Sequence, residues 1–211
     1  MFITNSLINM KKVLALFTLA AALTAFAFVP RNVGIGYLVG DTATDFNLKN
    51  TNGDMVSLAG IKDAKGYIVV FTCNQCPYAI AYEDRIIELH KKYAPLGYPV
   101  IAINPNDKSI QPGDSFDNMK KRVQAKNIPY NYVYDETQEI AKTYGATRTP
   151  HVYLLDKNRV VRYIGAIDDN SEEPSAVTEK YVENAIEALR AGEEVKVKQT
   201  KAIGCGIKWK A

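Results

Sequence analysis

Three runs of apolar and β-branched residues predict the strands at the centre of a sheet. The runs cover residues 67–72, 99–104 and 130–134, and the first reads Tyr-Ile-Val-Val-Phe-Thr without a charged residue. A continuous apolar run, unlike an alternating one, is typical of a strand that is buried on both faces. We therefore expect the strands at 67–72 and 99–104 to lie inside a sheet that is covered on both sides.

Two pairs of shorter segments predict β-hairpins. The first pair flanks Asn52-Gly53, in which both residues accept positive φ and therefore favour a tight turn. The second pair flanks the polar segment 156–159. The paired segments are 45–48 with 55–58, and 151–155 with 160–167.

Helical spacing of apolar residues, together with capping residues, predicts four helices. Ser115 is a favourable N-cap for the second helix, and Gly145 and Gly192 are favourable stops for the third and fourth. The helices are expected over 77–93, 115–126, 137–144 and 176–191. This order of strands and helices predicts one α/β domain over 35–191, with a mixed central sheet flanked by helices. Residues 192–211 are expected to form a basic, irregular C-terminal tail.

The N-terminal segment predicts a secretory signal. Lys11 and Lys12 precede seventeen uncharged residues, 13–29, a stretch shorter than the ~20 residues of a membrane-spanning helix. Ala25-Phe26-Ala27 is a small-residue cleavage site, so we expect a signal peptide over 1–27. An uncleaved membrane anchor is the alternative. Both predict that the body of the protein is periplasmic or secreted, in an oxidising environment that allows cysteine pairs.

Composition narrows the classes of function. The chain has 211 residues, of which 47% are hydrophobic and 23% charged, so it can bury a sizeable core. The formal net charge is +3, and Lys11 and Lys12 of the predicted signal contribute two of the positive charges. Charge therefore gives no reason to expect nucleic-acid binding. Three cysteines are too few for a disulfide-stapled miniprotein, and the odd number leaves one thiol over when a pair forms.

The candidate chemistry lies at the end of the first apolar strand, where two residues separate Cys73 from Cys76. Pro77 suits the first position of a helix, which makes Cys76 the N-cap. There the helix dipole and the unpaired N–H groups stabilise a thiolate, the attacking form of cysteine. We therefore predict that Cys76 attacks and that Cys73, outside the first turn, resolves. A structural disulfide and half of a metal site are the alternatives, with His90, His151 and Cys205 as further soft ligands.

Thr149 and Pro150 form a second candidate feature, because proline marks the entrance of a strand rather than its interior. With this pair and the cysteine motif at a strand-to-helix junction, residues 35–191 resemble the thioredoxin superfamily. The resemblance implies a thioredoxin-like fold in which the Thr149–Pro150 bond is cis and lies next to Cys73 and Cys76. It also implies that the backbone of Thr149 pairs with an extended substrate segment.

Three further pieces resemble the exported redoxins of the peroxiredoxin-like, AhpC/TSA-type group. These pieces are Gly40-Asp41-x-Ala43-x-Asp45-Phe46, Phe71-Thr72-Cys73-x-x-Cys76-Pro77-Tyr78 and Gly204-Cys205-Gly206-Ile207-Lys208-Trp209-Lys210. Counted from Phe71, the nucleophile position of a thioredoxin falls on Cys76, and the usual second-cysteine position falls on Ala79. In a peroxiredoxin pattern that ends at Cys76, Val69 and Cys73 stand where proline and threonine help to hold the peroxide. Peroxide reduction is therefore left open.

These features predict an enzyme, an exported thiol–disulfide oxidoreductase that cycles between a Cys73–Cys76 disulfide and its dithiol, with thiol-dependent peroxide reduction as a variant. The expected partners are protein disulfides or dithiols, or a peroxide, and a membrane or periplasmic electron donor. We expect no cofactor and no nucleic-acid partner. The alternatives are a Sco-type copper-binding chaperone, with His151 completing a Cu(I) site, and a redox-inert adaptor. The sequence leaves three roles open for Cys205: a resolving thiol, a contact to another chain, or an inert thiol.

Overall fold

The computed structural model describes residues 36–211. The predicted signal peptide over 1–27 and its cleavage site lie outside the described residues. Within the described range, none of the helices combines the length and the apolar character that crossing a membrane requires.

The described residues form a seven-stranded mixed sheet in the order β2-β1-β5-β4-β3-β7-β8. Strand β3 lies between β4, to which it is parallel, and β7, to which it is antiparallel. A separate two-stranded sheet joins β6 to β9. The bounds are β1 Leu48–Asn50, β2 Met55–Val56, β3 Gly66–Phe71, β4 Val100–Asn104, β5 Asn131–Tyr134, β6 Arg148–Thr149, β7 His151–Asp156, β8 Val161–Gly165 and β9 Cys205–Gly206.

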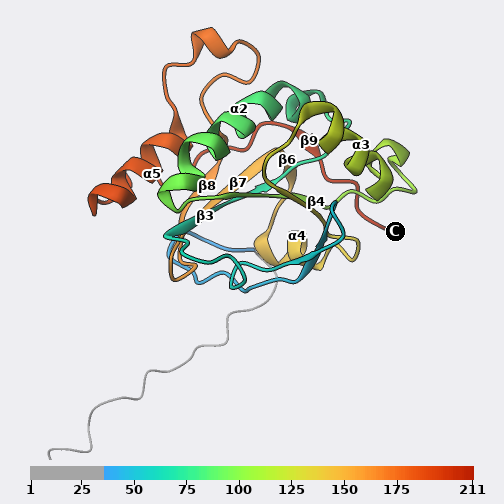
Figure 1. The fold of residues 1–211 in the computed structure, drawn as a ribbon. Helices are drawn as coiled ribbons and strands as arrows, with labels where there is room; N and C mark the ends of the chain where they lie inside the picture. The colour runs from blue at the N-terminus through green and yellow to red at the C-terminus, as the bar shows by residue number, and fades with distance from the viewer. Residues whose placement is uncertain (1–35) are drawn as a thin grey trace, which may run out of the picture. The chain divides into compact units, whose positions relative to one another are not determined.

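Helices cover both faces of the sheet, as the apolar runs predict (Figure 1). Helices α2 (Pro77–Tyr93), α3 (Phe116–Lys126) and α5 (Tyr181–Ala191) pack on one face, and α4 (Glu139–Tyr144) packs on the other. Alternate residues of β3 enter the two cores, with Ile68 and Val70 on the α2 side and Val69 and Phe71 on the α4 side. The predicted thioredoxin-like α/β fold is confirmed, including the N-terminal hairpin β1-β2.

The first hairpin has shorter strands than the sequence predicts. Its ladder pairs Leu48 with Val56 and Lys49 with Met55, and the flanking residues leave the ladder. The Asp45 side chain closes the open end instead, because its carboxylate accepts the backbone N–H of Leu58 at 2.7 Å. A side-chain hydrogen bond therefore replaces the outermost strand pairing.

The last helix begins later than the sequence predicts. Pro174–Ala176 form one 3₁₀ turn, and α5 starts at Tyr181 rather than at 176. Asp169 holds the intervening segment extended: its N–H donates to the Glu179 carbonyl, and its carboxylate accepts both the N–H and the hydroxyl of Thr178. These hydrogen bonds from outside the segment override the helical spacing of its apolar residues.

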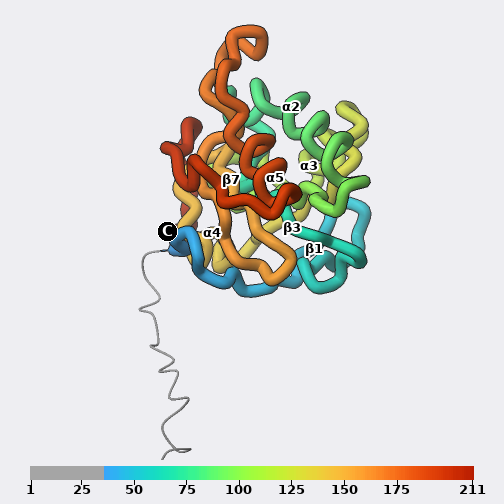
Figure 2. The backbone as a smooth tube through the Cα atoms, turned by 90° about the vertical axis from the view of Figure 1, so that its left-hand side faces the viewer, coloured from blue at the N-terminus to red at the C-terminus, as the bar shows by residue number. Residues whose placement is uncertain are grey.

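Residues 193–211 fold back over the domain, whereas the sequence predicts an irregular tail (Figure 2). Gln199 forms a parallel bridge with Ile164 of β8, and the Thr200 N–H donates to the Ile164 carbonyl. Gly165 makes room for this contact, because a Cβ there would lie 2.1 Å from Thr200 Oγ1. Ile207 is buried in the core on the α4 side. Most lysines of the segment are exposed, so its basic character does not conflict with its packing.

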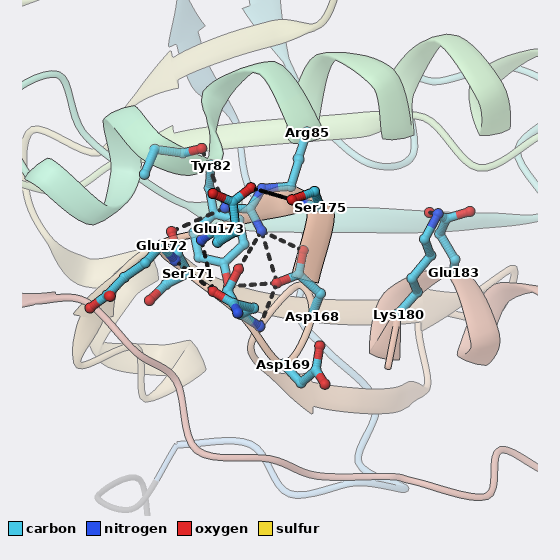
Figure 3. A network of polar contacts seen from close by, with 12 residues as sticks. Tyr82, Arg85, Asp168, Asp169, Ser171, Glu172, Glu173, Ser175, Lys180 and Glu183 are labelled. Atoms are coloured by element: carbon cyan, nitrogen blue, oxygen red, sulfur yellow. Dashed lines mark hydrogen bonds and ion pairs between the residues drawn. The ribbon is translucent and has the colours of Figure 1, made fainter. Parts of the chain in front are cut away.

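The loop that follows β8 is fastened to α2 by Arg85 (Figure 3). Arg85 Nη1 donates to both carboxylate oxygens of Asp168, at 2.8 and 3.0 Å, and to the Asn170 carbonyl at 2.6 Å. The Tyr82 hydroxyl donates to the same carboxylate at 2.8 Å. Because Asp168 is buried, this ion pair joins the loop firmly to the helix whose N-terminus carries Cys76.

We expect Asp168→Asn to lower the free energy of unfolding by about 2–4 kcal/mol, because Arg85 then stays largely buried without its counter-charge. Glu172→Gln changes an exposed carboxylate in the same loop and is the matched control. It should change the free energy of unfolding by less than ~0.5 kcal/mol. Urea denaturation followed by circular dichroism measures both, and equal effects of the two substitutions would contradict the assignment.

Candidate active site

Cys76 is the N-cap of α2, as the sequence predicts. Its backbone is extended, with φ −70° and ψ 125°, and Pro77 occupies the first helical turn. The Cys76 carbonyl accepts the Ile80 N–H at 2.9 Å, which begins the helical ladder. The first turn contains no acidic residue, so the positive end of the helix dipole is not neutralised there. A reduced Cys76 is therefore in a position that stabilises its thiolate.

Thr149 contacts both cysteines of the motif. The Thr149–Pro150 peptide bond is cis, as the resemblance implies, and leads from β6 into β7. Cys73 Sγ lies 3.3 Å from Thr149 Oγ1, and Cys76 Sγ lies 3.1 Å from the Thr149 carbonyl oxygen. The four predicted site residues Cys73, Cys76, Thr149 and Pro150 thus lie together. Both cysteines are buried, with exposed fractions of 7% for Cys73 and 4% for Cys76.

The disulfide in the structure joins Cys76 to Cys205, and Cys73 is a free thiol. It therefore differs from the predicted Cys73–Cys76 disulfide. The physical reason is the strand pair β6–β9, whose register sets Thr149 opposite Cys205 and Arg148 opposite Gly206. This pairing brings residue 205 to Cys76 across 129 residues of sequence.

Cys73 lies in an environment that disfavours its thiolate. Burial raises the pKa of the Cys73 thiol, and the Asp114 carboxylate raises it further. The hydrogen bond with Thr149 opposes these effects only in part. Cys73 therefore stays a protonated thiol up to a higher pH than an unperturbed cysteine does.

Asp114 is a site residue that the sequence analysis missed. It is fully buried, and its Oδ1 accepts the backbone N–H groups of Asn74 and Gln75, at 2.7 and 3.1 Å. Its Oδ2 accepts the Asn106 Nδ2 at 2.7 Å. The two residues between the cysteines are thereby fixed by one carboxylate. A cluster of Asn and Asp residues directly after the 99–104 strand is the local sign in the sequence, but nothing local links it to the cysteines.

A small pocket opens onto the cysteines. Its volume is about 150 Å³, and it is lined by Cys73, Gln75, Cys76, Asn106, Gln111, Asp114, Cys205 and Lys208. The segment around Cys205 lies against Cys76, to which it is disulfide-bonded.

The two histidines are placed as structural residues. His151 Nδ1 accepts the Thr147 N–H at 3.4 Å, and its ring packs on Tyr153. Burial lowers the pKa of His151 to about 4, so the ring is neutral at pH 7 and supplies no cation to a thiolate. His90 is half-buried, and its Nδ1 accepts the Val100 N–H at 3.2 Å. Over the described range, no three His, Cys, Asp or Glu side chains gather in a way that could hold a metal ion.

The chain is similar to two kinds of curated redox protein. It is 26% identical to the chloroplastic peroxiredoxin Q of Arabidopsis thaliana over 159 residues, and this alignment covers 72% of this chain and 67% of that protein. It is 27% identical to the thiol-disulfide oxidoreductase ResA of Geobacillus thermodenitrificans over 129 residues, and this alignment covers 60% of this chain and 68% of that protein. One of these two relatives is named as a peroxiredoxin and the other as a thiol-disulfide oxidoreductase.

A solved structure and a family model agree with this result. The crystal structure of an uncharacterized conserved protein from Geobacillus kaustophilus matches with a TM-score of 0.78 and 38% identity, over 82% of this chain and 93% of that one. The model of the AhpC/TSA family matches residues 39–164, which contain Cys73, Cys76, Thr149 and Pro150 but not Cys205. On this fold, this cysteine site and this match, the chain belongs to the AhpC/TSA family of redoxins in the thioredoxin superfamily and is a thiol oxidoreductase of that family.

Proposed function

We propose that this redoxin is an exported thiol–disulfide oxidoreductase in which Cys76 attacks the substrate disulfide and Cys73 resolves the intermediate. The observation that carries the proposal is the position of Cys76. Cys76 is the N-cap of α2, and its Sγ lies 3.1 Å from the carbonyl oxygen of Thr149, the residue before cis-Pro150. It also forms a disulfide with Cys205, whose segment pairs with Thr149. Disulfide exchange requires an attacking thiol and a docked partner in this arrangement.

The assignment of roles follows from the different environments of the two cysteines. A thiolate at Cys76 is stabilised by the helix N-terminus, and this effect fades beyond the first turn. Cys73 lies before the helix, and burial together with the Asp114 carboxylate raises its pKa. The cysteine whose thiolate is stabilised attacks, and Cys73, whose pKa is raised, stays protonated until a disulfide forms at its neighbour.

The cycle then balances as two exchanges. The Cys76 thiolate attacks one sulfur of a substrate disulfide, the substrate S–S bond breaks, and one substrate thiolate leaves. Cys73 then loses its proton and attacks Cys76 Sγ, which expels the second substrate thiolate and closes Cys73–Cys76. The substrate gains two electrons and two protons, and a dithiol donor in the membrane or the periplasm restores them to the enzyme.

The Cys76–Cys205 disulfide enters the same cycle without an external oxidant. Attack of the Cys73 thiolate on Cys76 Sγ breaks the bond to Cys205, forms Cys73–Cys76 and leaves a thiolate at Cys205. Both Cys73 and Cys76 contact Thr149, on its hydroxyl and its carbonyl respectively, so the attacking and accepting sulfurs belong to one small cluster. The predicted disulfide and the one in the structure are thus two forms of one oxidised site.

Peroxide reduction is a second candidate, favoured by the small pocket over the cysteines and by the likeness to peroxiredoxin Q. In this reaction the Cys76 thiolate attacks the peroxide and the O–O bond breaks. The products are an alcohol or water and a sulfenic acid on Cys76. A second thiol then attacks the sulfenic sulfur and water leaves, which forms a disulfide. The test is consumption of hydrogen peroxide by the reduced enzyme.

Export is part of the proposal because of the N-terminal sequence. Lys11 and Lys12, the uncharged segment 13–29 and the Ala25-Phe26-Ala27 site support secretion with cleavage after Ala27. The mass of the protein recovered from a secreting host tests this: a mature chain that begins at Phe28 supports cleavage, and a full-length membrane-bound chain supports the anchor.

Substitution of the cysteines tests the assigned roles. Cys76→Ser should lower dithiothreitol-dependent insulin reduction by at least ~10³-fold, because it removes the attacking atom. Cys205→Ser is the matched control and should keep the activity, since it retains both proposed catalytic cysteines. Cys73→Ser combined with Cys205→Ser should accumulate a mixed disulfide on Cys76, detected by mass spectrometry. Full activity of Cys76→Ser, or adducts that form on Cys73 instead, would overturn the proposal.

Asp114→Asn tests why Cys73 stays protonated. In a Cys76→Ser, Cys205→Ser background, alkylation of Cys73 should begin only above the usual pH range of a free thiol, because burial and Asp114 raise its pKa. Asp114→Asn should shift the midpoint to lower pH and also lower the free energy of unfolding by about 2–3 kcal/mol. Asp117→Asn, on the exposed side of α3, should change neither quantity. A midpoint that Asp114→Asn leaves unmoved would contradict the electrostatic role.

A further inference from the structure

The segment around Cys205 is bound in the way that a substrate of the proposed reaction would be bound. It is extended, it pairs antiparallel with β6 in the register Thr149 to Cys205, and its cysteine is disulfide-bonded to Cys76. We infer that residues 204–208 occupy the substrate groove, and that the groove prefers an extended polypeptide with glycine before the reacting cysteine and an apolar residue two positions after it. This inference rests on the proposed function and names its substrate class.

The preference for glycine before the cysteine comes from backbone atoms. A Cβ at Gly204 would lie 2.2 Å from the Thr149 carbonyl oxygen, 2.6 Å from its carbonyl carbon and 3.0 Å from Pro150 N. Backbone at the entrance of a buried strand cannot yield as a flexible side chain does. The position after the cysteine is open, because a Cβ at Gly206 would have no neighbour within 4 Å.

The preference for an apolar residue comes from Ile207. Its side chain is only 6% exposed and belongs to the apolar cluster that contains Phe71, Tyr144 and Tyr153. Its N–H donates to the Thr147 carbonyl at 3.3 Å, which continues the pairing along the strand before Pro150. Burial of this side chain removes apolar surface from water, so a peptide with a smaller residue at this position binds measurably less well.

The next residue is held through its backbone alone. The Lys208 N–H donates to Asn106 Oδ1 at 2.9 Å, and its carbonyl accepts the Asp107 N–H at 3.0 Å and the Gln138 Nε2 at 2.7 Å. Main-chain hydrogen bonds give affinity for any extended chain, whereas the tight position and the apolar pocket give selectivity. Side-chain identity at this position is therefore expected to matter little.

The segment can leave the groove while the rest of the tail stays attached. Thr200 is anchored on β8 through the Ile164 carbonyl, the Tyr163 hydroxyl and the Ala166 N–H. Residues 201–203 then cross to the groove, and Ile203 is exposed there. Transfer of the disulfide from Cys76–Cys205 to Cys73–Cys76, as balanced above, breaks the covalent bond of the segment to Cys76. The segment and a substrate then compete for the same groove.

The first experiment compares peptides as substrates. Full-length, pre-reduced Cys205→Ser enzyme is mixed with the peptide of residues 202–210 carrying glutathione on its cysteine, and release of the peptide thiol is followed in a single turnover. Alanine in place of the glycine before the cysteine should slow release at least ~10-fold, and alanine in place of the isoleucine should slow it about 10-fold. Alanine in place of the glycine after the cysteine is the control and should leave the rate within about twofold.

The second experiment measures the internal segment. In a Cys73→Ser background, only Cys76–Cys205 can form within the proposed site, and its equilibrium with glutathione reports how well the segment is docked. Gly204→Ala should lower the equilibrium constant for this disulfide at least ~10-fold, while Gly206→Ala should leave it within about twofold. Circular dichroism confirms that both variants are folded, so the difference reports the groove.

The outcomes separate this inference from the proposed function. Enzyme that reduces insulin but releases all peptides at equal rates, or that shows no difference between Gly204→Ala and Gly206→Ala, overturns the inference and leaves the function standing. Cys205→Ser enzyme that reduces neither insulin nor any peptide overturns the proposed function itself.

Discussion

The contact of Thr149 with all three cysteines is the constraint on which the site depends. Thr149 is fully buried and precedes the cis peptide bond, so its hydroxyl, its carbonyl and its strand-pairing groups are directed into the site. The hydroxyl meets Cys73, the carbonyl meets Cys76, and the backbone pairs with Cys205. The central strands hold this position, because Phe71 at the end of β3 pairs with His151, two residues after Thr149.

The same geometry places the two cysteines of one short motif in different environments. Cys76 lies at the positive end of a seventeen-residue helix without an acidic residue in its first turn. Cys73, three residues earlier, is buried beside the Asp114 carboxylate, which raises its pKa. The carboxylate also fixes the loop between the cysteines through two backbone N–H groups. One buried carboxylate thus positions the loop and raises the pKa of Cys73, a role that the motif alone does not reveal.

The C-terminal segment belongs to the site although it lies beyond the part of the chain that matches the family model. It supplies the partner of Cys76 and covers the groove next to cis-Pro150. It is attached at β8 through Thr200, at β6 through Cys205, and beyond β9 through the backbone of Lys208. The small pocket beside this segment is lined by Cys73, Cys76 and Cys205.

The sequence by itself determined the elements whose causes are local. Continuous apolar runs predict β3 and β4, Pro77 predicts the start of α2 with Cys76 as its N-cap, and all are found as predicted. The tertiary structure decided what depends on distant partners. Cys205 reaches Cys76 across 129 residues through a two-residue strand, and Asp114 reaches the cysteine loop from a separate turn. Such contacts follow from how the sheet assembles, so no period, cap or spacing near these residues could specify them.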